Sequence, residues 1–246
     1  MEDLERYGDY NEYEDDAPKG KNKVVLLLKI LIAAVCITVI GLFAFRMIMF
    51  NYYPDSMDKL YFNDTLTAFY NKTEGDIDAK TKAIQYPYDN EKGTTFYAGN
   101  FFYVGGAQQV QFSLRYNKTL SSEIEKKWGV TLSDNLAESF TFVLYRNNPN
   151  FVKGEDPDSE MFVPIGTLDA VVTDTSMTYN YFKLVFDGVD LDADTLGAVD
   201  WLSVAIYVNG TESDADPYRI AVYERGSSST LFKDYELSGE EKPSDN

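Results

Sequence analysis

The residues best suited to chemistry are aspartates that recur in one short stretch. The stretch reads Asp-Gly-Val-Asp-Leu-Asp-Ala-Asp, and its acidic residues are Asp187, Asp190, Asp192 and Asp194. Carboxylates at alternating positions are typical of calcium loops, because Ca²⁺ takes several oxygen ligands. Counted from Asp190, Thr195 and Trp201 replace the Gly and Glu of an EF-hand loop. Two interpretations stay open: a calcium loop of another form, or an acidic loop that is merely solvated.

The residue inventory limits catalysis. The chain has no histidine, and its single cysteine, Cys36, lies inside a long apolar run. This excludes histidine-based acid–base and nucleophilic catalysis, His-ligated zinc and an exposed catalytic thiol. A pair of carboxylates, as glycosidases use, is the chemistry that remains. We therefore predict that the protein is not an enzyme and binds no cofactor other than calcium; the alternative is a carbohydrate-active enzyme with paired carboxylates.

Aromatic residues offer a third kind of site. The chain contains 19 Tyr and 16 Phe. A tyrosine-rich sheet face could bind a protein or a glycan, although aromatic residues also fit an ordinary half-buried strand. The residues considered for such a face are Tyr86, Tyr88, Phe101, Tyr103, Tyr179 and Tyr181.

The elements that carry these residues follow an apolar run between Val24 and Phe50, whose only charges are Lys29 and Arg46. The run is long enough to cross a hydrocarbon core of about 30 Å as a helix. A cleaved signal peptide is the alternative. We prefer an uncleaved signal-anchor, because the run is too long for a signal peptide and ends in bulky side chains with no small-residue cleavage site.

The basic residues predict the orientation. Lys19, Lys21, Lys23 and Lys29 lie on the N-terminal side, against Arg46 and Lys59 on the other. By the positive-inside rule the N-terminus stays in the cytoplasm and the C-terminal part is extracytoplasmic. We therefore expect a single-pass protein of the plasma membrane. An exported part without cysteine has no disulfides, which favours a bacterial cell envelope over an animal ectodomain.

Net charge and composition limit the classes of partner that the chain can bind. The formal net charge is −18, so the chain repels nucleic acid and we expect no nucleic-acid partner. Hydrophobic residues make up 44% of the chain, which is enough for a packed core. The expected partners are the membrane itself and a protein of the envelope, with a glycan as a further option.

The pattern after the apolar run is mainly β. Residues 108–116 alternate Val110, Phe112, Leu114 and Tyr116 with polar residues, which predicts a strand with one buried and one wet face. Residues 119–129 predict one helix ending at Gly129, with Ser121 or Ser122 as its cap. Further strands are predicted at 94–104, 139–146, 162–173, 179–186, 200–208, 218–224 and 230–237. This predicts an antiparallel β-sandwich, Ig-like or jelly-roll-like, with a barrel as the alternative.

The expected organisation has five parts. They are a disordered acidic cytoplasmic tail (1–22), a transmembrane helix (23–50), a membrane-proximal linker or short helix (51–82), an extracytoplasmic β-sandwich (83–238) and a disordered C-terminus (239–246). From these parts we expect a membrane-anchored protein that binds a protein or surface partner in an accessory or scaffold role. A calcium-stabilised adhesin is a further alternative.

Overall fold

The structure is a computed structural model that describes residues 19–82, 96–148, 160–191, 201–212, 215–224 and 232–238. The chain divides into two units, Met1–Met49 and Phe50–Asn246, and each is described by itself. Residues 1–18 of the predicted tail and the predicted C-terminus at 239–246 lie outside the described residues.

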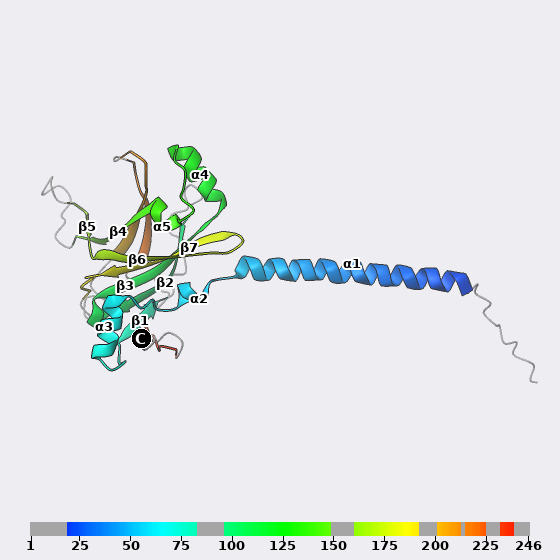
Figure 1. The fold of residues 1–246 in the computed structure, drawn as a ribbon, viewed down its shortest axis with the longest axis horizontal. Helices are drawn as coiled ribbons and strands as arrows, with labels where there is room; N and C mark the ends of the chain where they lie inside the picture. Colours follow the sequence, from blue (N-terminus) through cyan, green and yellow to red (C-terminus); the bar gives the residue numbers. More distant parts are fainter. Residues whose placement is uncertain are drawn as a thin grey trace, which may run out of the picture. The chain divides into compact units, whose positions relative to one another are not determined.

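Helix α1 spans Lys19–Asn51 (Figure 1). Within it, Lys23–Ile48 is a stretch of 26 residues that is long and apolar enough to cross a membrane. Its side chains are exposed all round the helix, for example Ile37, Ile40 and Phe43. A helix that is apolar on every side suits a lipid environment. The helix predicted at 23–50 is therefore present as a candidate span.

The second unit is mainly β and contains two antiparallel sheets. The six-stranded sheet has the order β10-β1-β2-β3-β7-β6. The four-stranded sheet has the order β5-β4-β8-β9. The bounds of these strands are β1 Ala79–Lys82, β2 Phe96–Val104, β3 Gln109–Asn117, β4 Phe140–Asn147, β5 Phe162–Pro164, β6 Thr167–Thr175, β7 Tyr179–Asp187, β8 Trp201–Val208, β9 Tyr218–Glu224 and β10 Lys233–Asp234.

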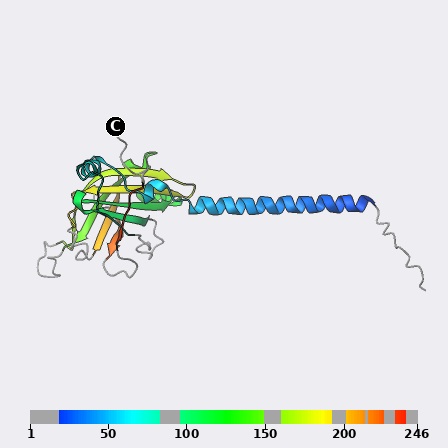
Figure 2. The same ribbon diagram turned by 90° about the horizontal axis from the view of Figure 1, so that it is seen from below.

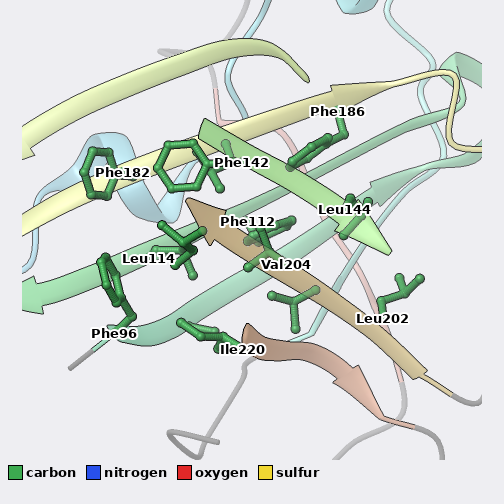
Figure 3. Packing of buried hydrophobic residues seen from close by; sticks show 14 of the residues in the cluster. Phe96, Phe112, Leu114, Phe142, Leu144, Phe182, Phe186, Leu202, Val204 and Ile220 are labelled. Carbon is green, nitrogen blue, oxygen red and sulfur yellow. The ribbon is translucent and has the colours of Figure 1, made fainter. Parts of the chain in front are cut away.

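Both sheets contribute to one hydrophobic core. Phe182 of β7 contacts Phe142 of β4, with ring centroids 5.3 Å apart, and Phe96 of β2 contacts Phe140 of β4 at 5.9 Å. In Figure 3 the strands of the four-stranded sheet cross those of the six-stranded sheet, with the labelled apolar side chains between them. Figure 2 shows the same two sets of strands from another side. The alternating apolar residues of the sequence thus point inward from two sheets.

Two α-helices lie between β3 and β4 in the chain. Helix α4, Thr119–Trp128, confirms the predicted helix, and Gly129 ends it in the left-handed conformation (φ +66°). The predicted serine cap is wrong: Asn117 Oδ1 accepts the backbone N–H of Thr119 at 3.0 Å. A short helix, α5, covers Leu136–Ser139.

The strand predicted at 162–173 is two strands in two sheets. β5 ends at Pro164 and pairs with β4, whereas β6 begins at Thr167 and pairs with β7. Between them Gly166 has φ +66°, a conformation that L side chains rarely adopt. Proline and glycine break the extended run here, so the chain crosses from the four-stranded to the six-stranded sheet.

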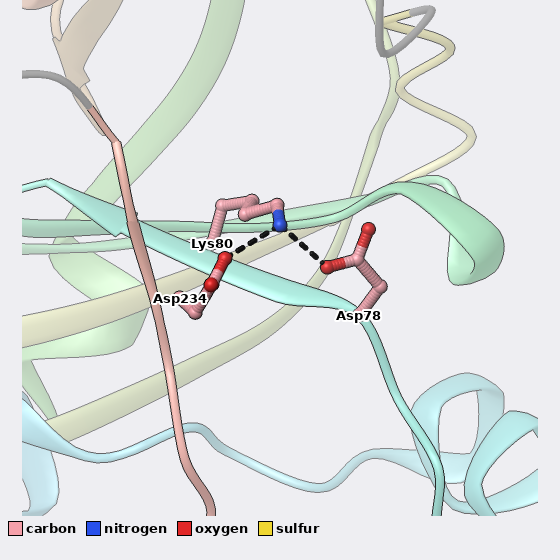
Figure 4. Close-up of polar contacts among 3 residues, drawn as sticks. All are labelled: Asp78, Lys80 and Asp234. Carbon is pink, nitrogen blue, oxygen red and sulfur yellow. Dashed lines mark hydrogen bonds and ion pairs between the residues drawn. The ribbon is translucent and has the colours of Figure 1, made fainter.

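The six-stranded sheet begins inside the predicted linker. β1 pairs with β2, and the two-residue β10 pairs with β1 on the other side. Lys80 of β1 lies 2.6 Å from Asp234 of β10 and 2.8 Å from Asp78 (Figure 4). The hydrogen bonds that Lys80 Nζ donates to these two carboxylates raise the pKa of Lys80. Both carboxylates are exposed to solvent, so this cluster stabilises the edge only weakly.

Candidate functional site

Asp187, the first residue of the predicted calcium loop, is the last residue of β7. Its Oδ2 accepts hydrogen bonds from Thr65 Oγ1 at 2.7 Å and Asn63 Nδ2 at 3.1 Å. Its Oδ1 accepts one from Gln109 Nε2 at 2.7 Å. A calcium ion would need the lone pairs of the Asp187 carboxylate oxygens, which here accept these three hydrogen bonds. Asp187 thus ties β7 to the residues that follow α1.

Of the other three predicted calcium ligands, the structure describes one. Asp190 is exposed, and Asp192 and Asp194 lie outside the described residues. Among the residues that the structure describes, no three His, Cys, Asp or Glu side chains come together as a metal site. Calcium binding by the stretch from Asp187 to Asp194 stays a prediction.

Asp187 belongs to a polar network between the six-stranded sheet and the segment Tyr52–Leu66, which we call the strap. The strap contains the short helix α2, Asp55–Asp58, and enters helix α3, Asp64–Lys72. It contacts the face of the sheet opposite the core, which we call the outer face. Gln109, Gln111 and Ser113 of β3 point to this face and are 0% exposed. The predicted wet face of β3 is therefore wrong, because the strap covers it.

The side-chain amide of Gln111 binds the backbone in the middle of the strap with one donor and one acceptor, as the backbone of a neighbouring strand would. Its Nε2 donates to the carbonyl of Tyr61 at 2.7 Å, and its Oε1 accepts the N–H of Tyr61 at 2.8 Å. The same Nε2 donates to Gln109 Oε1 at 2.6 Å. One side-chain amide thus satisfies both backbone groups of Tyr61, which meets the need of buried polar groups for partners.

Asn63 is the centre of the network. Its Oδ1 accepts the N–H of Leu66 at 2.9 Å, which caps α3, and accepts Gln109 Nε2 at 2.8 Å. Its Nδ2 donates to Asp169 Oδ2 at 2.7 Å and to Asp187 Oδ2. Every lone pair and hydrogen of this buried amide has a partner, so α3 is fixed to β3, β6 and β7 through one side chain.

The strap is bound to the sheet from its first residue. The Tyr181 hydroxyl donates to the carbonyl of Tyr52 at 2.9 Å, and the hydroxyls of Tyr53 and Ser113 lie 2.5 Å apart. Burial raises the pKa of Tyr53, and the hydrogen bond with Ser113 lowers it in part. Gly99 of β2 makes room for this contact, because a Cβ there would fall on the hydroxyl oxygens of Ser113 and Tyr53.

A buried lysine lies beneath α2. Lys183 of β7 is 0% exposed; its Nζ donates to the carbonyl of Met57 at 3.3 Å and stands 4.0 Å from the centroid of the Phe102 ring. Burial raises the pKa of Asp58, while the charge of Lys183 and a hydrogen bond from Asn100 act in the opposite direction. The ammonium is held by a carbonyl and an aromatic face, two groups that stabilise a desolvated cation.

The network contains two neighbouring carboxylates, the kind of pair that the alternative prediction of a carbohydrate-active enzyme requires. Asp169 and Asp187 both accept a hydrogen bond from Asn63 Nδ2. Asp187 has two further donors, Thr65 and Gln109. These contacts fasten the strap to β6 and β7, so the pair has a structural role in this arrangement.

Three of the six aromatic residues considered for an exposed face are buried. Phe101 and Tyr181 are 0% exposed and Tyr103 is 4% exposed. Tyr86 and Tyr88 lie outside the described residues. Tyr179 is half-buried, and the guanidinium of Arg115 stands 5.0 Å from the centroid of its ring.

A different aromatic cluster lies on the four-stranded sheet, on the face opposite the core. The hydroxyls of Tyr145 on β4 and Tyr207 on β8 are 3.4 Å apart, and the guanidinium of Arg219 on β9 stands 5.0 Å from the Tyr145 ring centroid. Both tyrosines are half-buried and Arg219 is exposed. The hydrogen bond between the tyrosines and partial burial raise the pKa of Tyr145. We call these three residues the tyrosine–arginine cluster.

Sequence reasoning missed this cluster although a signal was present. In β4, Phe142 and Leu144 point to the core and therefore place Tyr145 on the opposite face. The antiparallel register pairs Tyr145 of β4 with Ser203 of β8, four residues before Tyr207, and pairs Arg219 of β9 with Ala205 between them. The register of three strands was needed to bring the residues together, and the sequence alone does not supply it.

Comparison with known proteins gives no assignment. No protein-family model matches the chain, and no curated protein or solved structure is significantly similar to it.

The Gly99 contact generates a first prediction. Gly99→Ala should lower the free energy of unfolding by about 1–3 kcal/mol, because the new methyl group displaces the Tyr53 and Ser113 hydroxyls. Denaturant unfolding of the full chain in detergent measures this. In a background of Tyr53→Phe and Ser113→Ala, which lacks both oxygens, the same substitution should have a smaller effect. An equal loss in both backgrounds would contradict the contact.

Asn63 generates a second prediction. Asn63→Asp keeps an oxygen for the cap of α3 but places a carboxyl group against Asp169 and Asp187. Repulsion raises the pKa of the introduced group, so the folded state binds its proton more tightly than the unfolded state. The variant should be less stable than the wild type by about 2–4 kcal/mol near neutral pH and should recover as the pH falls toward about 4.

Thermal unfolding across this pH range checks the result. The control is Asn71→Asp, which introduces the same charge at an exposed position of α3. A loss of stability at Asn63 that equals the control and does not depend on pH would show that Asn63 is not the centre of the network.

Proposed function

We propose that this protein is a single-pass membrane protein whose exported β domain binds a protein or surface partner, in an accessory or scaffold role without catalysis. The length and apolar character of α1 support the anchor. The core shared by the two sheets supports a β-sandwich as the binding domain.

The orientation in this proposal has the N-terminus in the cytoplasm and residues after α1 in the extracytoplasmic space. It rests on the excess of lysines before the span, Lys19, Lys21 and Lys23. A bacterial cell envelope is the setting that fits an exported domain without cysteine.

The single observation that carries the binding role is the tyrosine–arginine cluster. Tyrosine and arginine are enriched where proteins bind one another, because they combine a large apolar area with hydrogen-bonding groups. The hydroxyl contact and the stacked guanidinium hold Tyr145 and Tyr207 in place before a partner arrives. Such preorganisation reduces the entropy lost on binding. The strap covers the outer face of the other sheet over β3 and β7, which leaves the four-stranded sheet as the better surface.

The orientation is tested by cysteine labelling in intact cells. In a Cys36→Ser background, Lys72→Cys places a thiol at an exposed position of α3, and Gly8→Cys places one before the span. A membrane-impermeant maleimide should label Lys72→Cys in intact cells and Gly8→Cys only after permeabilisation. The reverse pattern would refute the proposed orientation.

The binding role is tested by crosslinking the full-length protein in its native membrane and identifying what co-purifies. Tyr207→Ala and Arg219→Ala should each reduce recovery of the specific partner about tenfold, the loss typical of an interface anchor. Tyr61→Ala is the matched control, because the Tyr61 side chain is 38% exposed and lies on the strap. Equal recovery from all three variants would remove the cluster from the binding surface.

A further inference from the structure

The turn between β6 and β7 presents an exposed apolar side chain. Met177 is 58% exposed at the tip of this hairpin. The tip is fixed by hydrogen bonds from Ser176 N to the Tyr179 carbonyl and from Lys118 N to the Thr178 carbonyl, each 2.9 Å long. A methionine held outward on a fixed turn exposes apolar area that a partner could bury.

This tip lies beside the start of the strap. The Tyr181 hydroxyl, which donates to the Tyr52 carbonyl, is 3.5 Å from Ser176 Oγ. Tyr53 packs edge-on against the Tyr181 ring, with centroids 5.5 Å apart. The residue next to Met177 is thus joined through one tyrosine to the first residue of the strap.

The covalent chain limits how far this end of the domain can lie from the end of the apolar stretch. That stretch ends at Ile48, and the backbone of Tyr52 is already bonded to the sheet. The intervening residues can span at most about 14 Å even when fully extended. This limit holds whatever the angle between α1 and the domain.

The side chains at this end match the chemistry of a membrane surface. Tyr52 is 49% exposed, Lys118 is exposed, and the guanidinium of Arg115 stands 5.6 Å from the Tyr97 ring centroid and 5.0 Å from that of Tyr179. Tyrosine concentrates at the headgroup level of bilayers, and arginine and lysine attract anionic phosphates.

The acidic groups nearby are Asp55, Asp58 and Asp174. Asp174 accepts hydrogen bonds from Ser56 Oγ at 3.0 Å and from Thr175 N at 2.7 Å, so its charge is partly compensated. The basic residues stand out because the chain as a whole has a net charge of −18.

We propose that the surface formed by Tyr52, Arg115, Lys118, Met177 and Tyr179 rests on the phospholipid headgroups, with Met177 entering the interface. This inference rests on the anchor in the proposed function but not on the binding role. The occupant is a lipid surface because the chain leaves the span within reach of this end, and because exposed apolar and basic groups occur together on it.

The test uses the full-length protein in vesicles of phosphatidylethanolamine and phosphatidylglycerol. In a Cys36→Ser background, Met177→Cys carries an environment-sensitive fluorophore. Met161→Cys is the matched control: Met161 is 55% exposed and immediately precedes β5, which Figure 1 shows at the other end of the domain. A side chain about 5–10 Å into the headgroup region should give blue-shifted emission and about threefold weaker quenching by iodide than the control.

The outcomes separate this inference from the anchor. Flotation of the protein with the vesicles after an alkaline wash shows that α1 is inserted. If the protein floats but both labels are quenched equally, the headgroup contact is refuted and the anchor stands. If the protein does not float, both are refuted.

Discussion

The second unit depends on how three polar side chains in the middle of a sheet are satisfied. Gln109, Gln111 and Ser113 stand on the outer face of β3 and are fully buried. A buried amide without partners costs about 1–3 kcal/mol, more than one apolar contact returns. The strap supplies those partners through the Tyr61 backbone and the side chains of Asn63 and Tyr53. Sheet and strap are therefore a single cooperative structure.

This coupling makes the residues after α1 part of the fold. Met57 and Leu66 are 0% exposed against the sheet, and Lys183 lies under Met57. A soluble form that begins after the strap would expose a lysine, two amides and a serine in the middle of the sheet. Little free chain consequently separates Ile48, where the apolar stretch ends, from Tyr52, whose carbonyl is bonded to the sheet.

The sequence predicted which residues form strands and helices well, but predicted poorly which segments pack against them. Periodicity located β3, β7 and β8 because alternating apolar residues are a local signal. The same alternation predicted that the polar face of β3 is exposed to solvent, because Gln, Ser and Arg side chains can hydrogen-bond either to water or to a polar segment that covers them. The cover comes from residues some 50 positions earlier, as Gln111 and Tyr61 illustrate, and no local pattern records that pairing. Likewise, the calcium interpretation of Asp187 rested on spacing, whereas its contacts are with Thr65, Asn63 and Gln109.

Asn63 also bears on how the chain can be produced. Asn63-Asp64-Thr65 is an acceptor sequence for N-linked glycosylation, and the modified atom would be Nδ2. That nitrogen points between Asp169 and Asp187, while Thr65 Oγ1 is bonded to Asp187. A sugar at Asn63 and a docked strap exclude each other, whereas the acceptor sequence at Asn71 is exposed on α3. A secretory host that attaches glycans before the domain folds would therefore trap some chains with the strap undocked. Replacing Thr65 with a residue other than serine would remove the glycosylation acceptor at Asn63, but it would also remove the hydrogen bond from Thr65 to Asp187.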